Sequence, residues 1–121
     1  ETRTNAVNPV IENAKAWLER ELHANPTLSD AADHVQMNPT YFSEYFKKHV
    51  GETFLQYTTR MKMQRAKALL ADHTLRVYDV ASQVGYSDHR HFSKVFQSKT
   101  GMTPSEYRSQ VLSMSGAPGD D

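Results

Sequence analysis

Hydrophobic positions recur at helical spacing along most of the chain. Ile11, Ala14, Leu18 and Leu22 lie three or four residues apart, which is the period of an amphipathic α-helix. No segment shows the alternation of apolar and polar residues that is typical of a half-buried strand. The pattern therefore predicts an all-α fold.

The expected helices begin and end at recognised helix signals. Asn8 followed by Pro9 is a typical start, and Thr27 with Asp30 has the spacing of a capping arrangement. Gly51 is placed as a C-terminal cap. We expect seven helices, at about residues 9–25, 28–35, 39–49, 53–72, 77–84, 89–99 and 104–112.

The second half of the chain repeats the first. Shifts of 49 and 50 residues align the two halves, and the one-residue slip between these shifts falls between Val84 and Phe92, where we expect a turn. Each repeat is predicted as a short helix, a tight turn, a longer helix, a glycine stop and the start of another helix. The aligned pairs are Asp30/Asp79, Ala32/Ala81 and Val35/Val84, then Phe42/Phe92, Ser43/Ser93, Phe46/Phe96, Gly51/Gly101, Thr53/Thr103 and Tyr57/Tyr107.

Each repeat has the pattern of a helix-turn-helix. In this motif the first helix braces the second, and the N-terminal half of the second enters the DNA major groove. We expect two such units, at about 28–49 and 77–99, joined by the helix at 53–72. The expected core of the two units is Ala32, Val35, Phe42 and Phe46, and Ala81, Val84, Phe92 and Phe96.

The two predicted turns differ in one residue. Gly85 lies where the turn favours a positive φ, and the matching residue in the first unit is Gln36. A side chain with a Cβ adopts that conformation at a cost of about 1 kcal/mol. We therefore expect a slightly strained or looser first turn.

Polar residues occupy the outward face of each longer helix after the core positions are removed. Arg, Lys and His can donate to guanine O6 or N7, and Glu can accept from cytosine N4. The alternative interpretation is an ordinary solvated helix face. The outward residues are Thr40, Ser43, Glu44 and Lys47 in the first unit, and His89, Arg90, His91, Ser93, Lys94 and Gln97 in the second.

Charge is unevenly distributed although the formal net charge is zero. Residues 1–37 carry three basic and six acidic groups, whereas residues 38–68 carry six basic and two acidic groups. Phosphate binding depends on the charge of the local face and not on the sum. The zero net charge therefore does not exclude a nucleic-acid partner.

Composition limits the other classes of function. The 121 residues include no Cys, which excludes disulfides, thiolate zinc sites and Cys nucleophiles. His89 and His91 are two residues apart and point in different directions on a helix, so they do not form a shared metal site. No apolar run approaches the roughly 18–20 residues that cross a bilayer. We expect no enzyme activity, no cofactor and no membrane association.

The two ends are expected to lie outside the folded domain. Residues 1–7 are predicted to be a linker, and residues 113–121, rich in Ser, Gly, Pro and Asp, to be a disordered tail. The domain is therefore expected at 8–112. The absence of an initiator Met suggests a segment of a longer protein.

The second unit resembles the AraC/XylS family of bacterial transcription regulators. The matching stretch runs from Ala81 to Phe96, as ASQVGYSDHRHFSKVF, and continues as GMTPSEYR from Gly101. Gln97 departs from the usual basic residue of the family. The first unit matches more loosely, from Asn38 to Lys48 and at Gly51, and the resemblance covers about residues 9–109.

The resemblance implies a cytoplasmic bacterial regulator that binds a double-stranded DNA operator through two tandem heads. It also implies a missing N-terminal sensor or receiver domain, most similar to the response-regulator subgroup, and contact with RNA polymerase. Glu44 departs from the basic residue that many members carry there. Base-reading positions map onto Thr40, Ser43, Glu44, Arg90, His91 and Lys94, and we expect phosphate contacts from Lys47, Lys48, Ser87, His89, Ser93 and Lys99.

The spacing of the two heads supports adjacent sites on one face of the duplex. A helix of roughly 20 residues spans about 30 Å, and successive major-groove faces lie about 34 Å apart. The alternative from another class is a helical module that docks a protein such as RNA polymerase. Salt separates the two, because specific DNA binding weakens steeply as salt rises.

Overall fold

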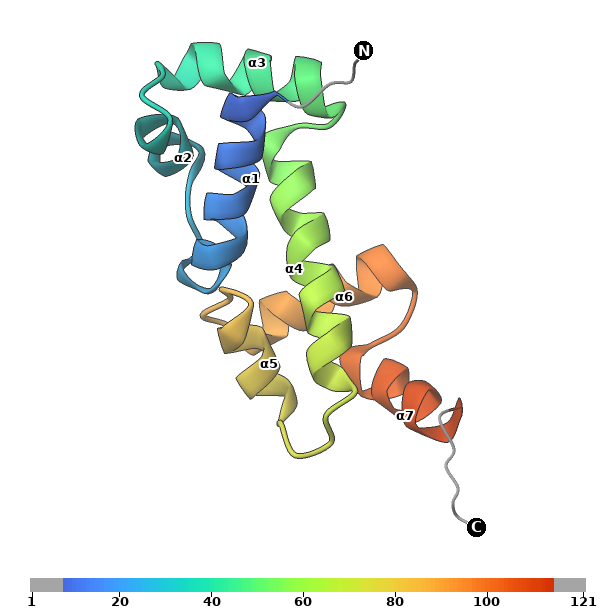
Figure 1. The fold of residues 1–121 in the computed structure, drawn as a ribbon. Coiled ribbons are helices and arrows are strands. Elements are labelled where there is room, and N and C mark those ends of the chain that lie inside the picture. Colours follow the sequence, from blue (N-terminus) through green and yellow to red (C-terminus); the bar gives the residue numbers. More distant parts are fainter. Residues whose placement is uncertain (1–7, 115–121) are drawn as a thin grey trace. The chain divides into compact units, whose positions relative to one another are not determined.

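The computed structural model describes residues 8–114, and within them it contains seven α-helices, one 3-10 turn and no strand (Figure 1). The expected all-α class is confirmed. The predicted linker at 1–7 and most of the predicted tail lie outside the described residues. The elements are α1 (Pro9–Glu21), η2 (Leu22–Ala24), α2 (Leu28–His34), α3 (Pro39–Val50), α4 (Phe54–Leu70), α5 (Val77–Gln83), α6 (His89–Thr100) and α7 (Pro104–Met114).

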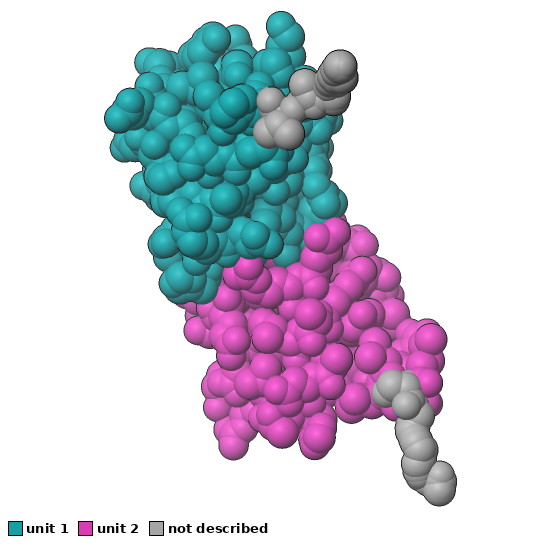
Figure 2. All heavy atoms as spheres, viewed as in Figure 1, with its two compact units in different colours: residues 1–61 teal, residues 62–121 magenta. Residues whose placement is uncertain are grey.

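The chain divides into two compact units, residues 1–61 and 62–121 (Figure 2). The boundary falls inside α4, so the first turns of this helix belong to unit 1 and its remainder to unit 2. Each unit has its own cluster of buried hydrophobic side chains. The prediction of two successive helical units is therefore matched by two separate cores.

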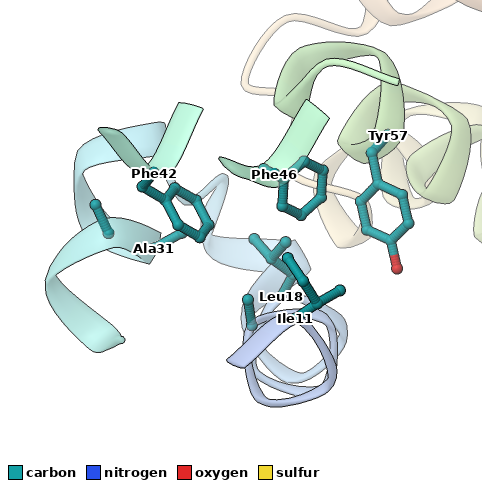
Figure 3. Close-up of a cluster of buried hydrophobic side chains, with 8 residues drawn as sticks. Ile11, Leu18, Ala31, Phe42, Phe46 and Tyr57 are labelled. Carbon is teal, nitrogen blue, oxygen red and sulfur yellow. The ribbon is translucent and has the colours of Figure 1, made fainter. Parts of the chain in front are cut away.

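The core of unit 1 is built around two phenylalanines of α3. Phe42 and Phe46 are completely buried, with ring centres 5.6 Å apart, and Tyr57 of α4 meets Phe46 edge-on at 5.4 Å. Leu18 of α1 and Ala31 of α2 belong to the same cluster (Figure 3). Burying an aromatic ring of this size stabilises a fold by roughly 2–3 kcal/mol relative to leaving it exposed, so α3 is held mainly by these two side chains.

Unit 2 repeats this arrangement on α6. Phe92 and Phe96 are completely buried with ring centres 5.8 Å apart, and Tyr107 of α7 meets Phe96 edge-on at 5.6 Å. Arg108 of α7 donates from Nε to the backbone oxygen of Leu70 at 2.9 Å, near the end of α4. The first turns of α7 therefore cover the core of unit 2 as those of α4 cover the core of unit 1.

The repeat extends further than the sequence alignment indicated. Three buried residues of α1 have the same spacing as three buried residues of α4 near the start of unit 2. The α1 residues are Ile11, Ala14 and Leu18. The α4 residues are Met63, Ala66 and Leu70, at a shift of 52 residues. The larger shift reflects η2, which lengthens the connection to α2 by three residues. Each unit therefore begins with a supporting helix and consists of three helices before its glycine stop.

The turn between α2 and α3 and the turn between α5 and α6 have the same hydrogen bonds. Met37 donates from its backbone N–H to Ala32 O at 2.9 Å, and Tyr86 donates to Ala81 O at 2.9 Å. These bonds run from the second residue past the C-cap back to the last turn of the helix and form a Schellman motif, which needs a left-handed residue between its two ends. Gly85 has φ +91° and Gln36 has φ +61°. The positive φ expected at Gln36 is confirmed.

The turns also locate the one-residue slip in the repeat. Met37 matches Tyr86 at a shift of 49, and the next residues, Asn38 and Asp88, match at a shift of 50. Ser87 is therefore the inserted residue. It lies immediately before the cap of α6, so it changes how the chain enters that helix.

Replacing Gln36 by glycine should stabilise unit 1 by about 1 kcal/mol, because a residue without Cβ adopts positive φ without steric cost. Gln36 is exposed, so little packing is lost. Trp17 is the chain's single tryptophan and packs against the unit 1 core, so its fluorescence in a urea titration reports this unit. Gln36→Ala is the matched control because it keeps the Cβ. Equal midpoints for the two variants would contradict the assignment of strain.

The structure corrects several boundaries and one core residue. The joining helix is 17 residues, shorter than the roughly 20 expected, because Thr53 is the capping residue and Asp72 belongs to the following turn. Ser113 lies in α7 and not in a tail. Val35, expected in the core, packs against it but is only partly buried, whereas its repeat partner Val84 is completely buried.

Candidate nucleic-acid interface

Helix α3 presents the candidate residues of unit 1. Its first turn is capped by the Asn38 side chain, whose Oδ1 accepts from the backbone N–H of Thr40 at 2.9 Å and of Tyr41 at 3.2 Å. Phe42 and Phe46 face the core, and Gly51 ends the helix with φ +93°. The polar side of the helix is consequently turned away from the core.

The structure brings together four of the unit 1 candidates. A shallow hollow on α3 is lined by Ser43, Glu44, Lys47 and Lys48, with Thr53 beside them. Glu44 and both lysines are exposed, whereas Ser43 is half-buried. Thr40 is exposed in the first turn of α3 but does not line this hollow. The hollow combines one acidic group with two basic groups.

Helix α6 presents the candidate residues of unit 2 and is capped by Asp88. The carboxylate Oδ1 of Asp88 accepts from the backbone N–H of Arg90 at 2.9 Å. This hydrogen bond, with the charge of the Arg90 guanidinium, lowers the pKa of Asp88. The Arg90 Nε lies 3.9 Å from Asp88 Oδ1, and the Arg90 side chain is 84% exposed. The ionised cap therefore lies beside a strongly exposed base-reading candidate.

A second hollow lies on α6 and is lined by Asp88, Arg90, His91 and Lys94. Arg90 and Lys94 are four residues apart, so they lie on the same face of the helix. The imidazole of His91 meets the ring of Tyr86 edge-on, with ring centres 5.4 Å apart. The three base-reading candidates of unit 2 thus share one hollow on the N-terminal half of α6.

The remaining candidates are spread around this hollow. Ser87 and His89 are exposed at the entry to α6, and Ser93 is half-buried. Lys99 is exposed in the last turn, eight residues beyond His91 and therefore about 12 Å farther along the helix. These positions fit the edges of an interface better than its centre.

The two helices differ in charge at matched positions. Glu44 of α3 corresponds to Lys94 of α6, and Thr40 corresponds to Arg90. The exposed face of α6 is therefore the more basic, as expected from the sequence. The structure adds Tyr41, which is 56% exposed and corresponds to His91. The same 50-residue shift could have identified Tyr41 from the sequence.

Two other classes of site find no support in the described part of the chain. Residues 8–114 contain no group of three or more His, Asp or Glu residues arranged to hold a metal ion. Among the described helices, none has both the length and the apolar character needed to cross a membrane.

Comparison with known proteins agrees with this geometry. A family model described as a helix-turn-helix domain matches residues 31–110, which include α3, α4, α5 and α6. The chain belongs to the AraC/XylS family of helix-turn-helix DNA-binding domains. The match covers the turns and both polar helices, so the repeat is the family's tandem pair of helix-turn-helix units.

One AraC/XylS relative is the regulatory protein PocR of Salmonella typhimurium, which is 32% identical over 108 residues. The alignment covers 89% of this chain and 36% of PocR. The chain therefore spans about a third of the length of this curated relative.

Solved structures share the AraC/XylS fold. The C-terminal domain of AraT, a response regulator from Geobacillus stearothermophilus, has a TM-score of 0.82 and 26% identity, with 88% of each chain covered. The DNA-binding domain of AdpA, a global transcriptional factor solved with a target DNA, also has a TM-score of 0.82, over 89% of this chain and 96% of its own. At 23% identity, the AdpA likeness concerns the fold.

Proposed function

We propose that this AraC/XylS domain regulates bacterial transcription by binding an operator in double-stranded DNA, with α3 and α6 each entering a major groove. The observation that carries the proposal is the repeated geometry. In both units a completely buried phenylalanine pair fixes a helix whose polar N-terminal half is exposed. A helix held in this way presents side chains to base edges without losing its own packing.

The proposed contacts follow the sequence expectations. Base edges are read by Thr40, Ser43 and Glu44 in unit 1 and by Arg90, His91 and Lys94 in unit 2. Phosphates are bound by Lys47, Lys48, Ser87, His89, Ser93 and Lys99. The guanidinium of Arg90 can donate hydrogen bonds to O6 and N7 of the same guanine, and Glu44 can accept a hydrogen bond from cytosine N4.

Several partners belong to the same proposal. Because the chain spans about a third of PocR, we propose that it is the output domain of a longer regulator. The likeness to the C-terminal domain of a response regulator supports a receiver as the accompanying domain. Contact with RNA polymerase and a location in the bacterial cytoplasm follow from this role in transcription.

Selection of bound sequences from a random duplex pool, at near-physiological salt, tests the proposal. Two spaced submotifs about one helical turn apart are expected if both units read DNA. Affinity for the selected duplex should fall steeply and log-linearly with salt, because phosphate contacts release counterions. Failure to enrich any sequence would contradict specific binding, and flat salt dependence would favour a protein-docking module.

Replacing Glu44 by alanine should relax sequence choice at one position of the unit 1 submotif without abolishing binding. The Glu44 carboxylate repels phosphate, and it contributes to DNA binding only where it accepts a hydrogen bond from a cytosine amino group. Repeating the selection with Glu44→Ala measures the change, and Glu44→Gln is the matched control because it keeps the acceptor oxygen. A uniform change in affinity across all sequences would contradict base reading by Glu44.

A further inference from the structure

Tyr86 connects three parts of unit 2. Its ring centre lies 4.9 Å from Nζ of Lys62 on α4, 5.4 Å from the imidazole centre of His91 on α6, and 5.5 Å from the ring centre of the buried Phe92. Tyr86 is itself half-buried, at the end of the turn that precedes α6. One side chain therefore touches the supporting helix, the core and the exposed face of the polar helix.

Lys62 is unusual because a lysine is rarely buried. It is only 8% exposed, and burial lowers the pKa of its ammonium group. Removing an ammonium ion from water is unfavourable, and a cation over an aromatic face recovers part of that cost. An apolar side chain of the same length would fill the site without this cost, so packing alone does not account for the charge.

Unit 1 forms the same fold without this arrangement. In the repeat, Lys62 corresponds to Val10 and Tyr86 to Met37, and both of these unit 1 side chains are partly buried. The residue that corresponds to His91 is Tyr41, which is 56% exposed. The contacts of Lys62 and Tyr86 are thus not required by the helix-turn-helix, and they occur beside the more basic of the two polar helices.

We propose that Lys62 and Tyr86 are positioning residues that hold the imidazole of His91 in one orientation on α6, so that unit 2 discriminates the base pair opposite His91. This proposal rests on the proposed function, since it assigns a specificity-determining arrangement to the same interface. His91 is exposed on α6, and the edge-on contact with Tyr86 restricts its ring before DNA arrives. A side chain that is ordered in advance loses less freedom on binding and contacts a single base geometry.

The test uses the 121-residue chain and the duplex that the wild-type chain selects from a random pool. Lys62→Met removes the charge but keeps an unbranched side chain, whereas Lys62→Arg keeps a cation. Each protein is titrated with the selected duplex and with duplexes changed one base pair at a time in the unit 2 submotif. Urea unfolding is measured in parallel.

Lys62→Met should reduce discrimination about 3–10-fold at one base pair, the same pair at which His91→Ala loses it. The Lys62→Met/His91→Ala double variant should lose no more than His91→Ala, because the two changes act through one contact. Lys62→Arg should discriminate base pairs as well as the wild type does, because it keeps a cation over the Tyr86 ring. Urea unfolding of the same variants separates a loss of discrimination at one base pair from a general loss of stability.

A spectroscopic measurement on the free chain tests the positioning directly. The imidazole of His91 lies with its centre 5.4 Å from the centre of the Tyr86 ring, so the aromatic ring of Tyr86 affects the NMR chemical shifts of the His91 ring protons. These shifts should move in Lys62→Met and in Tyr86→Leu but not in Lys62→Arg. Unchanged His91 shifts in Lys62→Met would overturn the proposal without reference to DNA.

The outcomes separate this proposal from the proposed function. If the wild-type chain selects no sequence, both the proposed function and the positioning role of Lys62 and Tyr86 are wrong. Normal selection with unaltered discrimination in Lys62→Met removes only the positioning role. Equal losses at every base pair in Lys62→Met and Lys62→Arg, together with lower stability, would show that Lys62 only supports the fold, and would also overturn the proposal.

Discussion

Replacing Phe96 by alanine is expected to destabilise unit 2 by about 3–5 kcal/mol, which is the range for truncating a buried phenylalanine. The Phe96 ring is completely buried and contacts the rings of Phe92 and Tyr107. A unit of about 60 residues buries a smaller share of its surface than a larger domain and has a correspondingly small free energy of unfolding. The loss is therefore comparable with the whole stability of the unit.

Amide hydrogen exchange along α5 and α6 measures this effect, because slow exchange there requires an intact unit 2 core. Lys94→Ala is the matched control on the same helix, since Lys94 is exposed and its truncation leaves the core intact. Phe46→Ala should have a similar effect on unit 1, where Trp17 fluorescence reports unfolding. A loss below about 1 kcal/mol for Phe96→Ala would be inconsistent with a packed ring.

Replacing Arg90 or Lys94 by alanine is expected to weaken operator binding by about 1–3 kcal/mol each, or roughly 5- to 150-fold. Both side chains are exposed and lie in the hollow on α6, so truncation removes a DNA contact without removing core packing. The Arg90→Ala loss should be concentrated at one guanine-containing base pair. Because the two residues are close neighbours on the helix, their effects need not add.

Titration of the selected duplex and of its single-base variants measures both changes. Lys99→Ala is the informative control, because a phosphate contact weakens binding almost uniformly across sequences and reduces the salt slope by about 1. Unfolding curves that match the wild type would exclude a folding defect. Unchanged operator affinity in both Arg90→Ala and Lys94→Ala would remove α6 from the proposed base-reading surface.

The asymmetry between the two units gives these experiments a direction. Unit 2 combines a glycine, Gly85, at the positive φ of its turn with Arg90 and Lys94, whereas unit 1 combines Gln36 at a positive φ with Glu44. We therefore expect unit 2 variants to lose more affinity than unit 1 variants. Phosphate contacts from Lys47 and Lys48, which lie beside Glu44 on α3, would make DNA binding by unit 1 depend mainly on salt concentration.

The sequence by itself determined the features that depend on neighbouring residues. Helix starts at Asn8 and Thr27 and stops at Gly51 follow from caps that bond within three or four positions, and the structure confirms them. The positive φ at Gln36 followed from its alignment with Gly85. The paired phenylalanines followed from helical spacing, because a helix repeats its buried face every three or four residues.

Tertiary structure alone decided how deeply each side chain is buried, since burial depends on what a distant segment places against it. Lys62 is buried under Tyr86, although its neighbours in sequence are those of an ordinary solvated lysine. Val35 and Val84 occupy matching positions but differ in exposure, and Ser43, predicted to face outward, is half-buried. The tandem repeat and its polar helices could therefore be predicted from the sequence, whereas the contact between buried Lys62 and Tyr86 beside α6 could not.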